Sequence, residues 1–202
     1  MKFEINQLYH IYNQGNNRQK IFFERENYLF FLRKVRTQLL PYCDVIAYCL
    51  MPNHFHFMVR VNETVKTVGV AQSDADSLDA KKRSLNDSIG ILLRSYTNAI
   101  NKRYDRSGKL FREGTKAECL TCPDIKELSF CESTNTKLRV DLKQYYPQSC
   151  FKYIHQNPVK AGLVKKIEDW EFSSSRDYSG LRNGTLIDRS LAKKLGIYDT
   201  SH

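Results

Sequence analysis

The stretch YCLMPNHFHFMVRV, residues 48–61, constrains the fold of this chain more than any other. From His54 onward apolar residues recur at every second position, a period that predicts a β-strand. Successive side chains of a strand point to opposite faces, so His54 and His56 would share one face while Phe55 and Phe57 share the other. Neutral imidazole is the commonest metal ligand in proteins, which makes the pair a candidate metal or catalytic site. Surface or strand-pairing histidines give the same spacing, so the pair alone leaves both interpretations open.

The elements around this strand come in an order that fits one fold class. Alternating or helical apolar periodicity predicts a strand at Leu8–Asn13, a helix at Glu26–Leu40, a strand at Asp44–Leu50, the histidine strand, a helix at Leu85–Tyr104 and a strand near Lys116–Leu120. This order is that of the α+β, ferredoxin-like (split βαβ) arrangement, an antiparallel sheet with helices on one face. We expect those helices to cover the phenylalanines and to leave His54 and His56 on the open face.

A second informative stretch, CFKYIHQNPVKAGLV, lies at residues 150–164. Tyr153 and Asn157 are four residues apart, so they share a face if the segment is helical. Pro158 predicts that this helix ends at Asn157, because the residue before a proline avoids the helical region. We predict a single domain over residues 1–202, with an insertion or connector at 121–148 followed by a C-terminal helix that carries the tyrosine.

Charge and composition narrow the class of partner. Lys and Arg number 32 against 22 acidic residues, and the net charge of +10 favours a polyanionic partner such as nucleic acid over a merely basic soluble protein. The N-terminus lacks the apolar core of a secretory signal, and no apolar run is long enough to cross a membrane. We therefore expect a cytoplasmic protein, nucleoid-associated when bound to DNA, with no membrane partner.

The six cysteines are expected to be reduced thiols, since no export signal is visible. A zinc site built from Cys119, Cys122, Cys131 and Cys150 is a lesser alternative. Structural zinc sites usually contain two tight cysteine pairs, and only the first two of these residues form one.

Tyr153 has a chemical role open to it besides packing. A tyrosine hydroxyl can attack phosphorus and form a covalent intermediate, but its ordinary pKa of about 10 makes it a weak nucleophile at neutral pH. A divalent cation on the scissile phosphate would neutralise charge and orient the groups in line. Two imidazoles with one oxygen ligand would suit Mg²⁺ or Mn²⁺, and a side chain one helical turn from Tyr153 would bring that third ligand beside the nucleophile.

Taken together, these segments resemble the single-tyrosine HUH transposases, in particular the REP-associated tyrosine transposase (IS200-like transposase) group. The resemblance runs from about Tyr9 to Tyr178. Four segments carry it in a shared order: MPNHFHFMV at residues 51–59, GKLFR at 108–112, YIHQNPVKAG at 153–162 and WEFSSSRDY at 170–178.

The resemblance implies a metal-dependent endonuclease and strand transferase that cuts hairpin-bearing single-stranded DNA. Tyr153 would be the nucleophile and hold the 5′ end as a phosphotyrosine. His54 and His56 would bind the metal with Asn157 as third ligand. Asn157 stands where many relatives have the longer glutamine, so a water-bridged contact or a role for Gln156 stays open.

The partner implied is structured single-stranded DNA, gripped by basic side chains through its phosphates. The DNA-binding candidates are Arg18, Arg94, Arg103, Lys109 and Arg112. Relatives include both monomers and dimers, so a homodimer is left open. The alternative function is a domesticated, catalytically weak protein that binds single-stranded DNA or RNA hairpins without cutting them.

Overall fold

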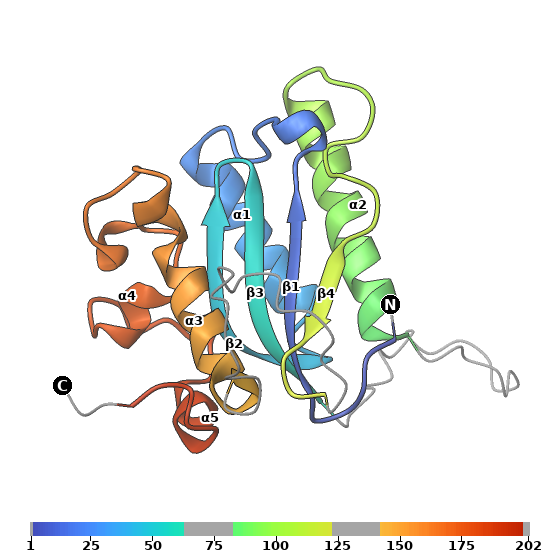
Figure 1. Cartoon of the computed structure of the whole chain (residues 1–202). Helices are drawn as coiled ribbons and strands as arrows, with labels where there is room; N and C mark the ends of the chain where they lie inside the picture. Colours follow the sequence, from blue (N-terminus) through green and yellow to red (C-terminus); the bar gives the residue numbers. More distant parts are fainter. Residues whose placement is uncertain (1, 63–82, 123–141, 200–202) are drawn as a thin grey trace, which may run out of the picture.

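The computed structural model describes residues 2–62, 83–122 and 142–199, and its centre is a four-stranded antiparallel sheet in the order β2-β3-β1-β4 (Figure 1). The strands are β1 (Leu8–Gln14), β2 (Cys43–Met51), β3 (His54–Val61) and β4 (Lys116–Cys119). The longer helices are α1 (Arg25–Gln38), α2 (Leu85–Arg103) and α3 (Leu142–Lys160). Short elements complete the list: η1 (Asn16–Arg18), η2 (Ile167–Asp169), α4 (Ser175–Tyr178) and α5 (Arg189–Lys194). The α+β class and the succession of elements up to β4 are those that the sequence predicts.

One face of the sheet is closed by α1 and α2. Phe55 and Phe57 of β3 are buried there, and the ring of Phe31 from α1 lies 5.4 Å from that of Phe55 and 6.4 Å from that of Phe57, measured between centroids. Tyr96 of α2 meets the Phe31 ring edge-on at 4.9 Å, and its hydroxyl donates to the carbonyl of Ile21. Aromatic rings packed at these distances bury large apolar areas and fix β3 from behind.

The opposite face is only partly open, because α3 packs across β2 and β3. Cys150 and Ile154 of α3 are fully buried against Ala47, Cys49 and Met58 of those strands. Figure 1 shows α3 over the β2 side of the sheet, away from β4. The expectation of an uncovered second face is therefore corrected. The uncovered part lies toward β1 and β4.

The tyrosine helix differs from its predicted limits at both ends. It begins at Leu142, so residues 142–148, assigned to the connector, are helical; residues 123–141 lie outside the described part of the chain. It continues past Asn157 to Lys160, with Pro147 and Pro158 inside. Pro158 is buried, and the N–H of Ala161 donates to the carbonyl of Asn157 at 2.9 Å. Buried packing thus outweighs the local preference of a pre-proline residue for extended backbone.

The segment after α3 fastens that helix to the sheet. The N–H of Leu50 donates to the carbonyl of Phe172, and the N–H of Ser174 donates to the carbonyl of Tyr48. Nε2 of His155, a buried residue of α3, lies 2.7 Å from Oγ of Ser174. The hydrogen bonds that join β2, Ser174 and His155 hold α3, and with it Tyr153, at a defined place over the sheet.

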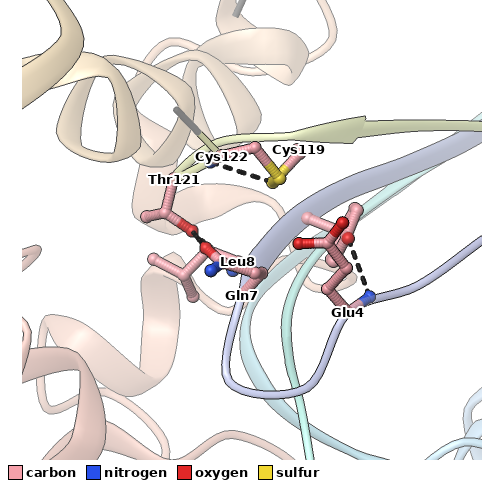
Figure 2. The surroundings of a disulfide bond; sticks show 7 residues. Glu4, Gln7, Leu8, Cys119, Thr121 and Cys122 are labelled. Atoms are coloured by element: carbon pink, nitrogen blue, oxygen red, sulfur yellow. Dashed lines mark hydrogen bonds between the residues drawn. A yellow bond between two sulfur atoms is a disulfide. The ribbon is translucent and has the colours of Figure 1, made fainter. Parts of the chain in front are cut away.

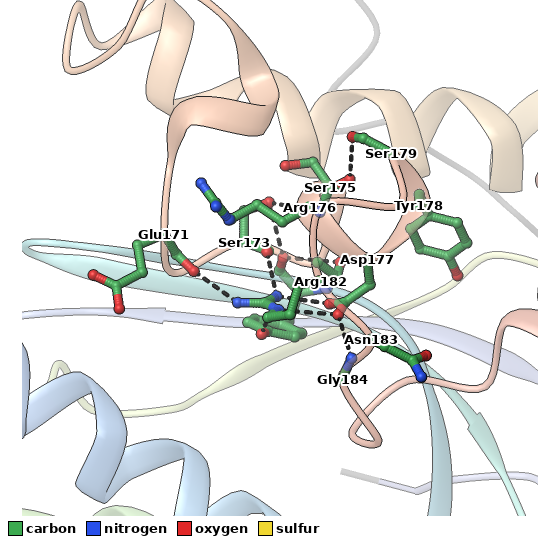
Figure 3. Close-up of polar contacts among 12 residues, drawn as sticks. Glu171, Ser173, Ser175, Arg176, Asp177, Tyr178, Ser179, Arg182, Asn183 and Gly184 are labelled. Carbon is green, nitrogen blue, oxygen red and sulfur yellow. Dashed lines mark hydrogen bonds and ion pairs between the residues drawn. The ribbon is translucent and has the colours of Figure 1, made fainter.

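Arg182 stabilises the same segment from its outer side (Figure 3). Its guanidinium pairs with the buried carboxylate of Asp177 at 2.6 Å and donates to the carbonyls of Glu171 and Ser173. It also donates to the hydroxyl of Tyr48 on β2. The side chain of Arg182 therefore connects three residues of the C-terminal segment to Tyr48 of the sheet.

Two of the cysteines depart from the expected reduced state. Cys119, the last residue of β4, forms a disulfide with Cys122, because the turn after the strand brings their Cα atoms to 5.6 Å (Figure 2). In the same turn the hydroxyl of Thr121 accepts from the N–H of Leu8 and donates to the side chain of Gln7. Cys43, Cys49 and Cys150 are free, buried thiols, and Cys131 lies outside the described residues. The alternative of a zinc site on Cys119 and Cys122 is therefore wrong for this state.

Within residues 2–62, 83–122 and 142–199, no helix combines the length and apolar character needed to cross a membrane.

Candidate active site

The two histidines of β3 lie on the face opposite its phenylalanines. In the sheet register His56 stands between Tyr12 of β1 and Cys49 of β2, and His54 between Gln14 and Met51. The two imidazole rings are 5.0 Å apart between centroids and nearly perpendicular. A rigid apolar layer behind the strand thus presents both rings to the partly open face.

Tyr153 of α3 reaches this pair from above the sheet. Its ring is half-buried and meets the His56 ring edge-on at 5.4 Å between centroids. The ammonium group of Lys160, nearly two helical turns further on, lies 5.9 Å from the centre of the Tyr153 ring. The structure therefore brings together the tyrosine and the histidines, which are about 100 residues apart in the sequence.

Asn157 occupies the place between His54 and Tyr153. Its side chain hydrogen-bonds with both of them, and its Nδ2 also donates to the backbone carbonyl of Tyr153 at 2.8 Å. Gln156 is exposed. Of the two candidates for a third ligand, Asn157 is the one whose contacts place it at the histidines.

The electrostatics keep both imidazoles neutral. Burial holds the pKa of His56 well below its ordinary value, and neighbouring His10 and His54 lower it further. Burial also lowers the pKa of His54, against an opposing effect of its hydrogen bond with Asn157. Burial raises the pKa of the Tyr153 hydroxyl, which the Asn157 hydrogen bond partly offsets. Neutral imidazoles are the ligand form for a cation, whereas the phenol needs nearby positive charge to become a nucleophile.

A pocket of about 360 Å³ opens beside these side chains. It is lined by Tyr12, Asn13, Gln14, His54, His56, Arg112, Glu113, Gly114, Lys116 and Tyr153. Nε2 of His56 is buried and has no hydrogen-bond partner among the residues that the structure describes. A buried nitrogen without a partner costs free energy in proportion to its desolvation, so its presence here favours a ligand that the pocket would receive.

A divalent cation fits this donor set in part. His54, His56 and Asn157 supply two neutral nitrogens and an amide, and the rest of a coordination sphere would come from water and phosphate. In the described part of the chain, no group of three or more His, Cys, Asp or Glu side chains is arranged to hold a metal ion. A third protein ligand would have to come from Asn157.

Sequence reasoning missed a third histidine and an acidic residue at this site. His10 of β1 is buried with Nε2 2.9 Å from Nδ1 of His56, and Glu118 of β4 stands opposite His10 in the sheet register. The signal that could have found His10 is its strand period: His10 and Tyr12 share a face of β1, which lies next to β3. That placement requires knowledge of the strand pairing.

The basic side chains predicted to bind DNA fall into two groups. Arg112 lines the histidine pocket, and with Arg94 and Lys109 it also lines a shallow neighbouring groove between α2 and the segment before β4. Arg103 instead pairs with Glu24 at 2.6 Å on the helix side of the molecule, and Arg18 is exposed in η1. Of the five candidates, the structure brings Arg112 to the histidine pocket and Arg94 and Lys109 to the groove beside it.

Comparison with known proteins returned structural likenesses only, in five chains of solved structures. No protein-family model and no curated protein matches the chain. Among solved structures, the chain is similar to a REP-associated tyrosine transposase bound to a REP hairpin, at 18% sequence identity, with a TM-score of 0.49 and coverage of 94% of this chain and 93% of that one. A likeness this distant does not establish a family, so function has to be argued from the geometry of the site.

Proposed function

We propose that this protein is a metal-dependent endonuclease and strand transferase that cuts single-stranded DNA through Tyr153. The observation that supports it best is that the Tyr153 ring lies edge-on to His56 above a pocket into which the unpartnered Nε2 of His56 can receive a ligand. A nucleophile beside neutral imidazoles, in a basic pocket, suits phosphoryl transfer better than acyl transfer, which would need oxyanion donors.

In this proposal the hydroxyl oxygen of Tyr153 attacks the scissile phosphorus. The new bond joins that oxygen to phosphorus, and the bond from phosphorus to the 3′ oxygen breaks. The phenol loses its proton and the leaving oxygen gains one, which yields a 5′-phosphotyrosine and a 3′ hydroxyl. Asn157 orients the phenol, and its hydrogen bond favours the deprotonated form.

Mg²⁺ or Mn²⁺ held by His54, His56 and Asn157 would supply the positive charge that the scissile phosphate requires. Lys116 and Arg112, which line the pocket, are placed to bind the flanking phosphates. A divalent cation bound there would also favour deprotonation of Tyr153, whose pKa burial raises.

The DNA strand is proposed to run from the pocket into the groove lined by Arg94, Lys109 and Arg112. The two depressions are neighbours, because Arg112, Glu113 and Gly114 line both of them. The sequence resemblance to single-tyrosine HUH transposases suggests a hairpin near the cleavage position. The strand order β2-β3-β1-β4 supports a ferredoxin-like class for the domain, extended by the helix that carries Tyr153.

The test is a denaturing gel of purified protein with end-labelled, hairpin-bearing single-stranded DNA. With Mg²⁺ or Mn²⁺ we expect a denaturation-resistant adduct that chelation of the metal prevents. Tyr153→Phe should abolish the adduct and keep DNA binding. Tyr104→Phe is the matched control, because that hydroxyl contacts Glu24 on the helix side of the molecule. An adduct that persists in Tyr153→Phe would refute the assigned nucleophile.

A domesticated hairpin-binding protein is the second candidate. The observation in its favour concerns the metal ligands. Among the described residues, no third His, Cys, Asp or Glu side chain stands with His54 and His56 to hold a metal ion, which leaves the amide of Asn157. This alternative expects salt-sensitive binding of DNA or RNA hairpins and no cleavage with any divalent metal. Matched DNA and RNA hairpins, tested with the gel above, separate the two candidates.

A further inference from the structure

His56, which lines the pocket, forms a buried pair with His10 of β1. Nε2 of His10 lies 2.9 Å from Nδ1 of His56, and their rings are only 19° from parallel. Both side chains are at least 95% buried. At this distance a single hydrogen joins the two nitrogens, so one ring must donate and the other must accept.

Glu118 influences which ring donates. Its Oε2 lies 4.0 Å from Nδ1 of His10, and its Oε1 accepts a hydrogen bond from the hydroxyl of Tyr12 at 2.6 Å. This separation is too long for a hydrogen bond, but a negative charge on that side of the ring electrostatically favours the tautomer of His10 with the hydrogen on Nδ1. Nε2 of His10 then carries a lone pair and can only accept.

The tautomer of His10 determines that of His56. If Nε2 of His10 accepts, then the hydrogen of the pair belongs to Nδ1 of His56. A neutral imidazole carries one hydrogen, so Nε2 of His56 is left with a lone pair. This nitrogen is buried and has no hydrogen-bond partner among the described residues. The opposite tautomer would put a hydrogen on this nitrogen and exclude it from ligation.

In His54 a single contact leaves the lone pair on Nε2. Its Nδ1 lies 2.6 Å from the side-chain oxygen of Asn53, which can only accept. The hydrogen of His54 is therefore on Nδ1, and its Nε2 also keeps a lone pair. Asn53 fixes the tautomer of His54 directly, because its side-chain oxygen can only accept. The tautomer of His56 depends instead on that of His10, which Glu118 influences.

We propose that His10 is a positioning residue that, together with Glu118, fixes the tautomer of His56 so that its Nε2 can receive a cation. Metal binding belongs to the proposed function, on which this role rests. The tautomer itself is a property of the metal-free protein.

The experiment is long-range ¹H–¹⁵N NMR of the metal-free protein at about pH 8, above the ordinary histidine pKa of about 6.5. The chain has five histidines, so single variants assign the signals. We expect His56 to carry its hydrogen on Nδ1 in the wild type. His10→Leu should remove that preference, whereas His10→Gln, whose amide oxygen can accept in place of Nε2, should restore it. A wild-type His56 with its hydrogen on Nε2 would overturn the proposal.

Titration with Mn²⁺ alone, followed by electron paramagnetic resonance, gives a second measurement. We expect His10→Leu to weaken binding about tenfold or more and His10→Gln to recover most of it. Equal affinity in the wild type and His10→Leu would contradict the role. If His10→Leu fails to fold, Glu118→Gln tests the same dependence, with a smaller loss of the Nδ1 preference expected and no change contradicting it. A wild type with the expected tautomer but no Mn²⁺ binding would refute the metal site and leave the tautomer assignment standing.

Discussion

The two faces of the sheet differ in the kind of side chain that β3 places on each of them. On the face under α1 and α2, Phe55 and Phe57 are enclosed by aromatic rings. On the face under α3, the same strand places His54 and His56 beside a pocket, and the buried Nε2 of His56 has no hydrogen-bond partner among the described residues. The alternation of side chains along β3 therefore places core residues on one face of the sheet and the candidate ligands on the other. Polar groups left without a partner in an otherwise well-packed protein are a mark of function.

The largest expected effect is on the free energy of unfolding, to which side chains on the two faces should contribute unequally. Phe57→Ala removes a fully buried ring and should lower the free energy of unfolding by about 3–5 kcal/mol, the range for large-to-small core changes. His56→Ala, one residue away on the other face, opens onto the pocket and should cost only about 1–2 kcal/mol. Urea unfolding of both variants checks the comparison. Equal losses would show that the two faces contribute alike.

A smaller effect should appear in the pH dependence of stability through the buried ring of His155. Burial lowers the pKa of His155 to about 3, against about 6.5 in the unfolded chain. The unfolded state therefore takes up the proton first. The stabilisation by the neutral ring is complete above about pH 6.5 and is lost as the pH falls toward about 3, which amounts to roughly 2 kcal/mol at pH of about 5. We expect His155→Gln to flatten the acid side of the stability profile, measured by unfolding at several pH values. Profiles of equal slope in wild type and variant would contradict this assignment.

The smallest effect concerns the basic side chains. Arg112→Ala should weaken binding of single-stranded DNA about three- to tenfold, and should reduce the slope of log affinity against log salt by about 0.7. Arg103→Ala is the matched control, since Arg103 pairs with Glu24 on the helix side and should change affinity by less than about twofold. Fluorescence anisotropy at several salt concentrations measures both. A larger loss of affinity in Arg103→Ala than in Arg112→Ala would indicate that DNA binds on the helix side of the molecule.

The sequence was most informative where a local period decides the structure. The alternation in β3 and the apolar stripes of α1 and α2 predicted the elements and the face of the histidines. The sequence was least informative where tertiary contacts override local rules, as at Pro158, which α3 passes because buried packing compensates for the lost donor. His10 was missed for a related reason. A lone histidine in a strand becomes part of a site only when the register places it beside His56.

The covalent bond itself gives the most direct test of the central claim, which is that Tyr153 and the β3 histidines act on one phosphate. The wild-type protein would be incubated with hairpin-bearing single-stranded DNA and Mn²⁺, digested with protease and nuclease, and analysed by mass spectrometry. We predict a single nucleotide-linked peptide, modified at Tyr153 and absent when His56 is replaced by Ala. Attachment at another residue, or an equal yield without His56, would contradict the account.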